Sequence, residues 1–313
     1  MKKILRAIII LLIPILLYYG LFLRFEPNNF FGLRAETPSG AVFGAIRQYR
    51  ENPSASVIVG DSRTAHLDMD RVEQLTGRRF SNLAFGGASL KEELDLLDWL
   101  LKHYPEINEV VLGSSFYTMN AAYNFDRFST IETALANPFA YLTSKSYNLE
   151  AMQNLIFWLQ GEKLGGGQDE TEDPANYKWA DFTTPTGYEV SLRGEIGNYL
   201  EKIAPYTEKW EPNTKQYERL LELIDSCAEK GIRFVVVFPP MHPAVREYDV
   251  EARGIDAGMA PLLAGLAASP ATLLDYELTS PPDFAEDQYF DGFHLDYQRG
   301  LPEWTEMLCE ELR

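Results

Sequence analysis

The chain has 313 residues, of which 46% are apolar and 24% charged, a composition typical of folded globular proteins rather than disordered ones. This length allows one large α/β domain or two smaller ones. The 28 basic and 46 acidic residues give a formal charge of −18, which argues against binding to the phosphate backbone of nucleic acids. Simple solubility is the plainest interpretation of the acidity.

The first 24 residues are predicted to form a membrane anchor. Lys2, Lys3 and Arg6 precede the uncharged run Ala7–Leu23, which is close to the shortest helix that spans a bilayer. A cleaved signal peptide is the alternative, but the run is longer than a usual signal core and no small-residue cleavage pattern follows it. A retained anchor with its basic end in the cytoplasm predicts a single-pass protein of the cell membrane with an extracytoplasmic domain.

Residues 25–53 are interpreted as a stalk, helical near 41–50, that leads to an α/β domain over 54–313. In this domain short apolar runs alternate with amphipathic segments, which predicts a parallel sheet in a three-layer α/β/α, flavodoxin-like fold. Residues 116–215 break the alternation and are interpreted as an insertion over the carboxyl edge of the sheet, helical near 147–159. The expected strands are 57–59, 80–85, 109–115, 233–238 and 271–275, and the expected helices are 71–75, 90–103, 214–230, 257–268 and 300–312.

Two cysteines, Cys227 and Cys309, lie in segments expected to be helical. The chain has no Cys-x-x-Cys pair, which excludes a zinc knuckle and a thioredoxin-type motif. Two buried thiols are the simpler interpretation. A disulfide is the alternative if the domain lies outside the cytoplasm.

A serine-bearing turn, Gly60-Asp61-Ser62, directly follows the first expected strand. Open α/β sheets place their sites at the carboxyl ends of strands, so Ser62 is a candidate nucleophile. A serine hydroxyl reacts only when a base removes its proton. The alternative is a purely structural turn in which Asp61 caps the next helix.

Four histidines could supply that base: His66, His103, His242 and His294. His294 is the strongest candidate because Asp291 precedes it by three residues and could hold its Nδ1 hydrogen, leaving Nε2 to face the serine. His242 follows the strand 233–238 and is also admissible, or else belongs to a structural loop. We expect His103 to lie on the surface. His66, four residues after Ser62, could face the site, but its reach back to Ser62 would be awkward.

Together these residues resemble the SGNH (GDSL-like) hydrolase superfamily, over about residues 54–313 with the middle third unmatched. The resemblance rests on Gly60-Asp61-Ser62, on Gly86 or Gly87 after the second strand, and on Asp291-Gly292-Phe293-His294. It implies Ser62 as nucleophile, His294 as base and Asp291 as the residue that orients the base. It also implies oxyanion donors from the backbone N–H of Ser62 and of Gly86 or Gly87.

The sequence departs from this family after the third strand, where Gly-x-Asn-Asp is usual and Gly113-Ser114-Ser115-Phe116 stands instead. Ser115 could donate a weaker hydrogen bond to the oxyanion, or Asn120 could replace the missing asparagine. Arg63 and Arg193 could bind an anionic group of a substrate, or could simply be solvated at the surface.

An amino-terminal anchor before such a domain is similar to the DltD-like and alginate-acetylation-like branches of the superfamily. The resemblance implies a serine esterase or O-acyltransferase acting on acyl groups of a cell-envelope glycan or polymer. The alternative is a catalytically weak binding or assembly subunit, with an integral-membrane acyltransferase as partner. A metal-dependent phosphate-ester enzyme is a poorer hypothesis, since no acidic ligand cluster is recognisable. No nucleotide-binding glycine loop occurs, so we expect no cofactor.

Overall fold

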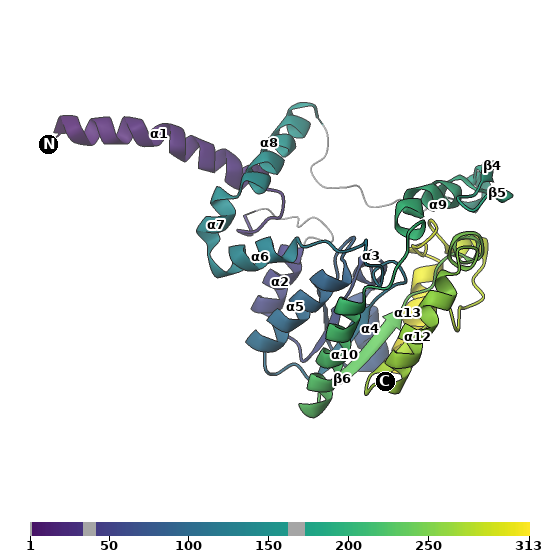
Figure 1. Ribbon diagram of the computed structural model, residues 1–313. Helices are drawn as coiled ribbons and strands as arrows, with labels where there is room; N and C mark the ends of the chain where they lie inside the picture. Colours follow the sequence, from purple (N-terminus) through teal and green to yellow (C-terminus); the bar gives the residue numbers. More distant parts are fainter. Residues whose placement is uncertain (1, 34–41, 162–172) are drawn as a thin grey trace. The chain divides into compact units, whose positions relative to one another are not determined.

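The computed structural model describes residues 2–33, 42–161 and 173–313, without the side chains of residues 2, 3, 5 and 7–9. The chain divides into two compact units (Figure 1). One unit comprises Met1–Arg50 and Arg127–Asp169, and the other comprises Glu51–Asp126 and Glu170–Arg313. The residues expected to form one insertion, 116–215, are therefore divided between the two units.

The second unit is built on a five-stranded parallel sheet in the order β2-β1-β3-β6-β7, which confirms the expected α/β class. Counted along the chain, this order is 2-1-3-4-5, one of the two common doubly wound orders. In such sheets the strand order reverses beside the first strand, and ligands bind at the carboxyl edge there. The strands are β1 Ser56–Val59, β2 Phe80–Asn82, β3 Glu109–Gly113, β6 Arg233–Phe238 and β7 Thr272–Asp275.

After their first residues, Ser56, Glu109 and Arg233, the central strands are apolar, as expected for a sheet with both faces covered. Val57, Ile58 and Val59 are fully buried, and the registers pair Ile58 with Val111 and Val111 with Val235. Three strands, β2, β3 and β7, are shorter than expected. The strand predicted over 80–85 ends at Asn82, whose side-chain oxygen accepts the Ala84 N–H at 3.0 Å and turns the chain.

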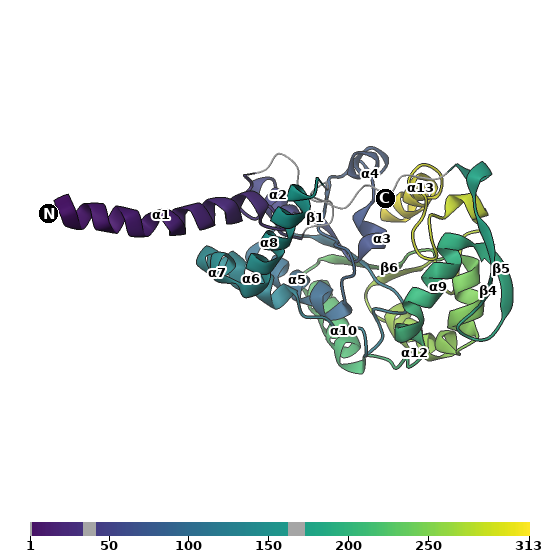
Figure 2. The same ribbon diagram turned by 90° about the horizontal axis from the view of Figure 1, so that it is seen from above.

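Helices cover both faces of this sheet, as Figure 2 shows. One face carries α4 Met69–Thr76 and α13 Gly300–Leu312, and Trp304 and Leu308 of α13 pack in a core with Ile58. The other face carries α5 Leu90–His103, α10 Thr214–Glu229 and α12 Ile255–Ala268. These bounds lie close to those expected from the apolar periodicity. The expected capping box of α5, Ser89 with Glu92, is also present.

Both cysteines are buried and free. Cys227 lies on α10 and Cys309 on α13, and these helices cover opposite faces of the sheet. The buried-thiol prediction is therefore confirmed, and the disulfide alternative is excluded.

The second unit also contains an antiparallel hairpin that the sequence pattern does not predict. Its strands are β4 Trp179–Thr183 and β5 Glu189–Arg193, preceded by the 3-10 turn η1 Pro174–Asn176 and followed by α9 Gly194–Thr207. Most side chains of β4 are exposed, so the hairpin has no apolar alternation from which it could be recognised. Short elements complete the unit: α3 Ser62–Ala65, α11 Pro243–Val245, η2 Arg246–Glu251 and η3 Glu286–Gln288.

The first unit consists of helices around a cluster of aromatic side chains. Its helices are α1 Lys2–Phe25, α2 Val42–Glu51, α6 Phe128–Ala136, α7 Pro138–Thr143 and α8 Lys145–Leu159. The ring of Tyr141 stacks on those of Phe30 and Tyr147, with centroids 4.4 and 4.5 Å away, and its hydroxyl donates to Glu26 Oε2 at 2.6 Å. Glu26 and Phe30, expected in a stalk, thus contribute to the packing of this unit.

The helix α1 packs against α8 within the first unit. Asn154 Nδ2 donates to the Phe25 carbonyl at 2.9 Å, and the rings of Phe25 and Trp158 lie 5.6 Å apart. Apolar side chains of α1, including Ile10, Leu11 and Leu16, are exposed. Among the residues that the structure describes, no helix is both long enough and apolar enough to cross a membrane.

Candidate active site

Ser62 stands on a tight turn at the carboxyl edge of the sheet, directly after β1. It is the first residue of α3, and the Asp61 side chain caps this helix by accepting the Arg63 N–H at 2.9 Å. Position 60 has no room for a side chain, since a Cβ there would lie 2.5 Å from Thr64 Oγ1 and 2.8 Å from the Gly113 carbonyl oxygen. The close approach of this turn to the end of β3 fixes the position of the serine.

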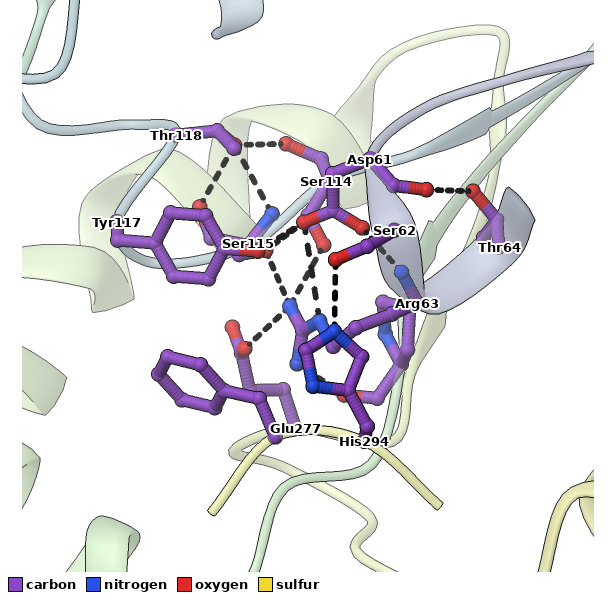
Figure 3. A network of polar contacts seen from close by, with 12 residues as sticks. Asp61, Ser62, Arg63, Thr64, Ser114, Ser115, Tyr117, Thr118, Glu277 and His294 are labelled. Carbon is purple, nitrogen blue, oxygen red and sulfur yellow. Dashed lines mark hydrogen bonds and ion pairs between the residues drawn. The ribbon is translucent and has the colours of Figure 1, made fainter. Parts of the chain in front are cut away.

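The serine hydroxyl forms a hydrogen-bonded chain with His294 and Asp291. Ser62 Oγ lies 2.7 Å from His294 Nε2 (Figure 3), and His294 Nδ1 lies 2.9 Å from Asp291 Oδ2. Asp291 Oδ1 also accepts the backbone N–H groups of Phe293 and His294, both at 2.8 Å. With a proton on Nδ1 shared with the carboxylate, Nε2 is the lone-pair nitrogen that faces the serine hydroxyl.

The charges of this pair set the proton affinities of both members. Burial would raise the pKa of Asp291, but its hydrogen bonds and charge interaction with His294 outweigh burial and lower that pKa below its usual value. Burial would lower the pKa of His294, but the hydrogen bond and the charge of Asp291 prevail and raise it above the ordinary 6.5. The carboxylate therefore stays ionised, and the imidazole is a stronger base than a free histidine.

A small pocket with about 10 Å³ of interior space lies beside Ser62 and His294. The rings of His66 and Tyr297 meet edge to face at 5.1 Å within its wall. Its other walls are mostly apolar. They are formed by Arg63, Pro239, Pro240, Phe293, Leu295, Leu301 and Trp304.

The glycine turn after β2 lies against the serine turn, since the Phe85 N–H donates to the Gly60 carbonyl at 3.0 Å. Gly87 has a φ of +64°, a left-handed conformation that favours glycine. A Cβ added to Gly86 would meet nothing within 4 Å. The turn carrying Gly86 and Gly87 is thus beside the nucleophile, as a donor of backbone hydrogen bonds would need to be.

The two side chains expected to replace the missing asparagine point elsewhere. Ser115 Oγ donates to Asp61 Oδ2 at 3.2 Å, behind the serine turn. Asn120 Nδ2 donates to the Tyr206 carbonyl, and its Oδ1 accepts the Ala122 N–H at 3.1 Å. Both polar side chains are therefore engaged in holding the loops that follow β3.

Arg63 is buried, at 4% exposure, rather than solvated at the surface. Its guanidinium donates to Glu277 Oε1 at 2.8 Å, to the Pro239 carbonyl at 3.1 Å and to the Ser114 carbonyl at 3.3 Å. It also donates to the Ser115 hydroxyl (Figure 3). Arg63 thus joins the ends of β3 and β6 to the first turn of α3, and the alternative of a solvated surface arginine is wrong.

Three ionisable residues behind Ser62 were missed by sequence reasoning: Tyr117, Glu277 and Glu93. The Tyr117 hydroxyl donates to Asp61 Oδ2, and Glu277 Oε2 accepts the Phe116 N–H at 2.8 Å. Burial raises the pKa of Glu277 to about 7 against the opposing charge of Arg63. Burial raises the pKa of Glu93 well above its usual range, and the charge of Asp61 adds to this. Tyr117 lies in the loop after β3, which ends at Gly113, and Glu277 in the loop after β7, which ends at Asp275, a placement that could have signalled them.

The remaining histidines have structural contacts. His242 Nδ1 accepts the Ala244 N–H at 3.1 Å, and its Nε2 lies 2.7 Å from Glu286 Oε2, so it belongs to the structural loop that was the alternative. His103 is exposed, as expected, with Nδ1 2.7 Å from the Trp99 carbonyl oxygen. His66 lines the pocket, but the base in contact with Ser62 is His294.

The sequence matches no protein-family model, and no curated protein matches it. Within residues 2–33, 42–161 and 173–313, no group of three or more His, Cys, Asp or Glu residues could hold a metal ion. The candidate site is thus defined by its own geometry: the hydrogen-bonded chain of Ser62, His294 and Asp291, as candidate nucleophile, base and acid, beside an apolar pocket.

Proposed function

We propose that the protein is a serine acyl-ester hydrolase or O-acyltransferase that works through a covalent acyl-Ser62. One observation carries the proposal: Ser62 Oγ is 2.7 Å from His294 Nε2, whose ring is held by Asp291 at 2.9 Å. A base within hydrogen-bond reach of a serine, oriented by a third group, is the arrangement that activates a hydroxyl. The motif resemblance to SGNH hydrolases and the strand order 2-1-3-4-5 support the same proposal.

In the first half-reaction, Ser62 Oγ attacks the carbonyl carbon of an ester and its proton passes to His294 Nε2. Asp291 stabilises the imidazolium through Nδ1, and we expect backbone N–H groups of Ser62 and of Gly86 or Gly87 to bind the oxyanion. The bond from carbon to the leaving alcohol then breaks, and His294 returns its proton to that alcohol.

In the second half-reaction, water or an acceptor hydroxyl attacks acyl-Ser62, with His294 again as base. Water gives a carboxylic acid, whereas an acceptor hydroxyl gives a new ester. In both cases Ser62 regains its proton.

Substitution of the nucleophile tests the proposal directly. We expect Ser62→Ala to abolish labelling by a fluorophosphonate probe and to lower the turnover of p-nitrophenyl acetate by at least about 10³-fold. Ser269→Ala is the control, since this serine follows α12 and its Oγ donates to the Leu266 carbonyl at 2.7 Å. If folded wild-type protein takes no label, or if Ser62→Ala labels as well as wild type, the enzyme proposal is wrong.

A second candidate is a binding or assembly subunit of an envelope-modification complex with an integral-membrane acyltransferase. The contacts of Ser115 and Asn120 favour it, because neither side chain donates to an oxyanion beside Ser62. Here Ser62→Ala would leave cellular function intact and the protein would co-purify with a membrane protein. Loss of envelope acyl modification in Ser62→Ala cells would argue for the enzyme.

We place this activity in the cell envelope, on a glycan or polymer, with the domain held at the membrane by the amino-terminal helix. Support comes from the basic residues before Ala7–Leu23 and from exposed apolar side chains on α8, including Met152, Ile156 and Leu159. Cell fractionation tests this location. A variant lacking residues 1–24 is the control and should stay in the soluble fraction. If the intact protein also stays there, the proposed location is wrong.

A further inference from the structure

Arg193, the last residue of the unpredicted hairpin, is one of the largest fully buried side chains of the protein. It is 2% exposed, and its guanidinium carbon lies 4.2 Å from the centroid of the Tyr177 ring. Its Nε lies 3.2 Å from an oxygen of Glu195, whose side chain is partly exposed. The side chain expected to be solvated or to bind substrate is therefore directed into the protein.

The guanidinium donates to main-chain carbonyls of one short segment. Arg193 Nη2 binds the Tyr289 carbonyl at 2.8 Å and also the Phe290 carbonyl, and Nη1 is 3.5 Å from the Glu286 carbonyl. This segment leads directly into Asp291. A planar guanidinium can hold adjacent carbonyls in a fixed geometry, which a flexible ammonium does less well.

The segment that Arg193 holds is one side of the tight loop that carries the acid and the base. Tyr289 forms an isolated antiparallel bridge with Leu295, and the Phe290 N–H donates to the His294 carbonyl at 2.8 Å. On the other side of the loop, the His242 N–H donates to the Gly292 carbonyl at 3.0 Å. A shift of the Tyr289 and Phe290 carbonyls would thus be passed to both Asp291 and His294.

Burying an arginine is costly unless its hydrogen bonds are satisfied. The neutral carbonyls and the one partly exposed carboxylate compensate only part of the cost of burying Arg193. Fold stability alone therefore gives a weak explanation for a buried cation at this position. The contacts of Arg193 indicate instead that its role is to hold the loop that carries Asp291 and His294.

We propose that Arg193 is a positioning residue for the acid–base pair, and that the β4–β5 hairpin serves to bring it there. It sets the distance between His294 Nε2 and Ser62 Oγ through the Tyr289 and Phe290 carbonyls. The expected effect on kcat rests on the proposed function. The effect on the position of the His294 ring does not depend on it.

The test compares Arg193→Ala and Arg193→Lys with wild type in the full-length protein. With p-nitrophenyl acetate we expect kcat to fall about 100-fold in Arg193→Ala and about 10-fold in Arg193→Lys, with KM changed less than about threefold, because the loop loses its alignment. Added methylguanidinium should restore part of the kcat of Arg193→Ala. Arg233→Lys is the control, since its guanidinium also binds main-chain carbonyls, of Glu311 and Leu312, away from Ser62.

A second measurement separates this inference from the proposed function. The pH titration of His294 by NMR, assigned with His294→Ala, needs no substrate. We expect its pKa to fall toward the ordinary value in Arg193→Ala and Arg193→Lys but not in Arg233→Lys. A changed titration in a protein without esterase activity would support the positioning role while the proposed function fails. An unchanged titration together with wild-type kcat in folded Arg193→Lys would overturn the positioning role.

Discussion

At the scale of single residues, the proposed function makes the reactivity of Ser62 depend on the protonation state of His294. The imidazole acts as a base only when neutral, and the hydrogen bond and charge of Asp291 raise its pKa against the effect of burial. Activity of the wild-type protein should therefore rise with pH through an apparent pKa above 6.5, the ordinary value for histidine.

Asp291→Asn should both slow the reaction and move its pH dependence. Without the negative charge the pKa of His294 falls, so the midpoint of the kcat/KM profile should shift to lower pH. The plateau should fall by about 10³–10⁴-fold, because an amide no longer holds the imidazole in the productive tautomer. The profile of kcat/KM against pH measures both effects, with Asp287→Asn as the control. A midpoint that stays in place would contradict the assigned pairing.

The contacts of Ser62 with His294 and of His294 with Asp291 could be predicted from the sequence, whereas the surroundings of the two arginines could not. Ser62, Asp291 and His294 each follow a recognisable strand end or spacing. The burial of Arg63 depends on Glu277, 214 residues away, and on carbonyl groups that every residue possesses. No residue type in the sequence marks such partners, so the prediction of solvated arginines was wrong for both.

At the scale of elements, the serine turn and the end of β3 are packed so closely that they leave no room for a side chain. We expect Gly60→Ala to lower the free energy of unfolding by about 1–3 kcal/mol, because its Cβ would overlap Thr64 and the Gly113 carbonyl. Urea denaturation measures this loss. Gly86→Ala, which has open space around its Cβ, should change stability by less than about 0.5 kcal/mol. Equal stability of both variants would refute the packing argument.

Elements with a strong apolar pattern were predictable within a few residues, including β6 and α13, whose observed bounds are Arg233–Phe238 and Gly300–Leu312. The β4–β5 hairpin was not, because its strands are largely exposed and contribute few apolar positions. Leu192 and Arg193, the last two residues of β5, are the buried residues of this hairpin. Surface hairpins of this kind are stabilised by contacts to other segments that periodicity does not show.

At the scale of the whole molecule, the division into two units was not foreseen in its details. The first unit combines Met1–Arg50 with Arg127–Asp169, segments far apart in the sequence. Contacts such as that of Tyr141 with Phe30 hold it together, and a periodicity argument addresses only neighbours along the chain. The α/β unit, in contrast, follows from strand–helix alternation, and the parallel sheet could be predicted from this alternation alone.

The buried pair of Glu277 and Arg63 makes folding of the α/β unit a proton-consuming process. Burial raises the pKa of Glu277 from 4.5 to about 7, so between these values the native state holds a proton that the unfolded chain has released. The contribution of Glu277 to the free energy of unfolding must then decrease as pH rises across that interval. Glu277→Gln, which carries no titratable proton, should show a weaker decrease than wild type when denaturation is followed from pH 5 to 8. Identical slopes in the two proteins would mean that Glu277 is already ionised beside Arg63 in the acidic part of this range.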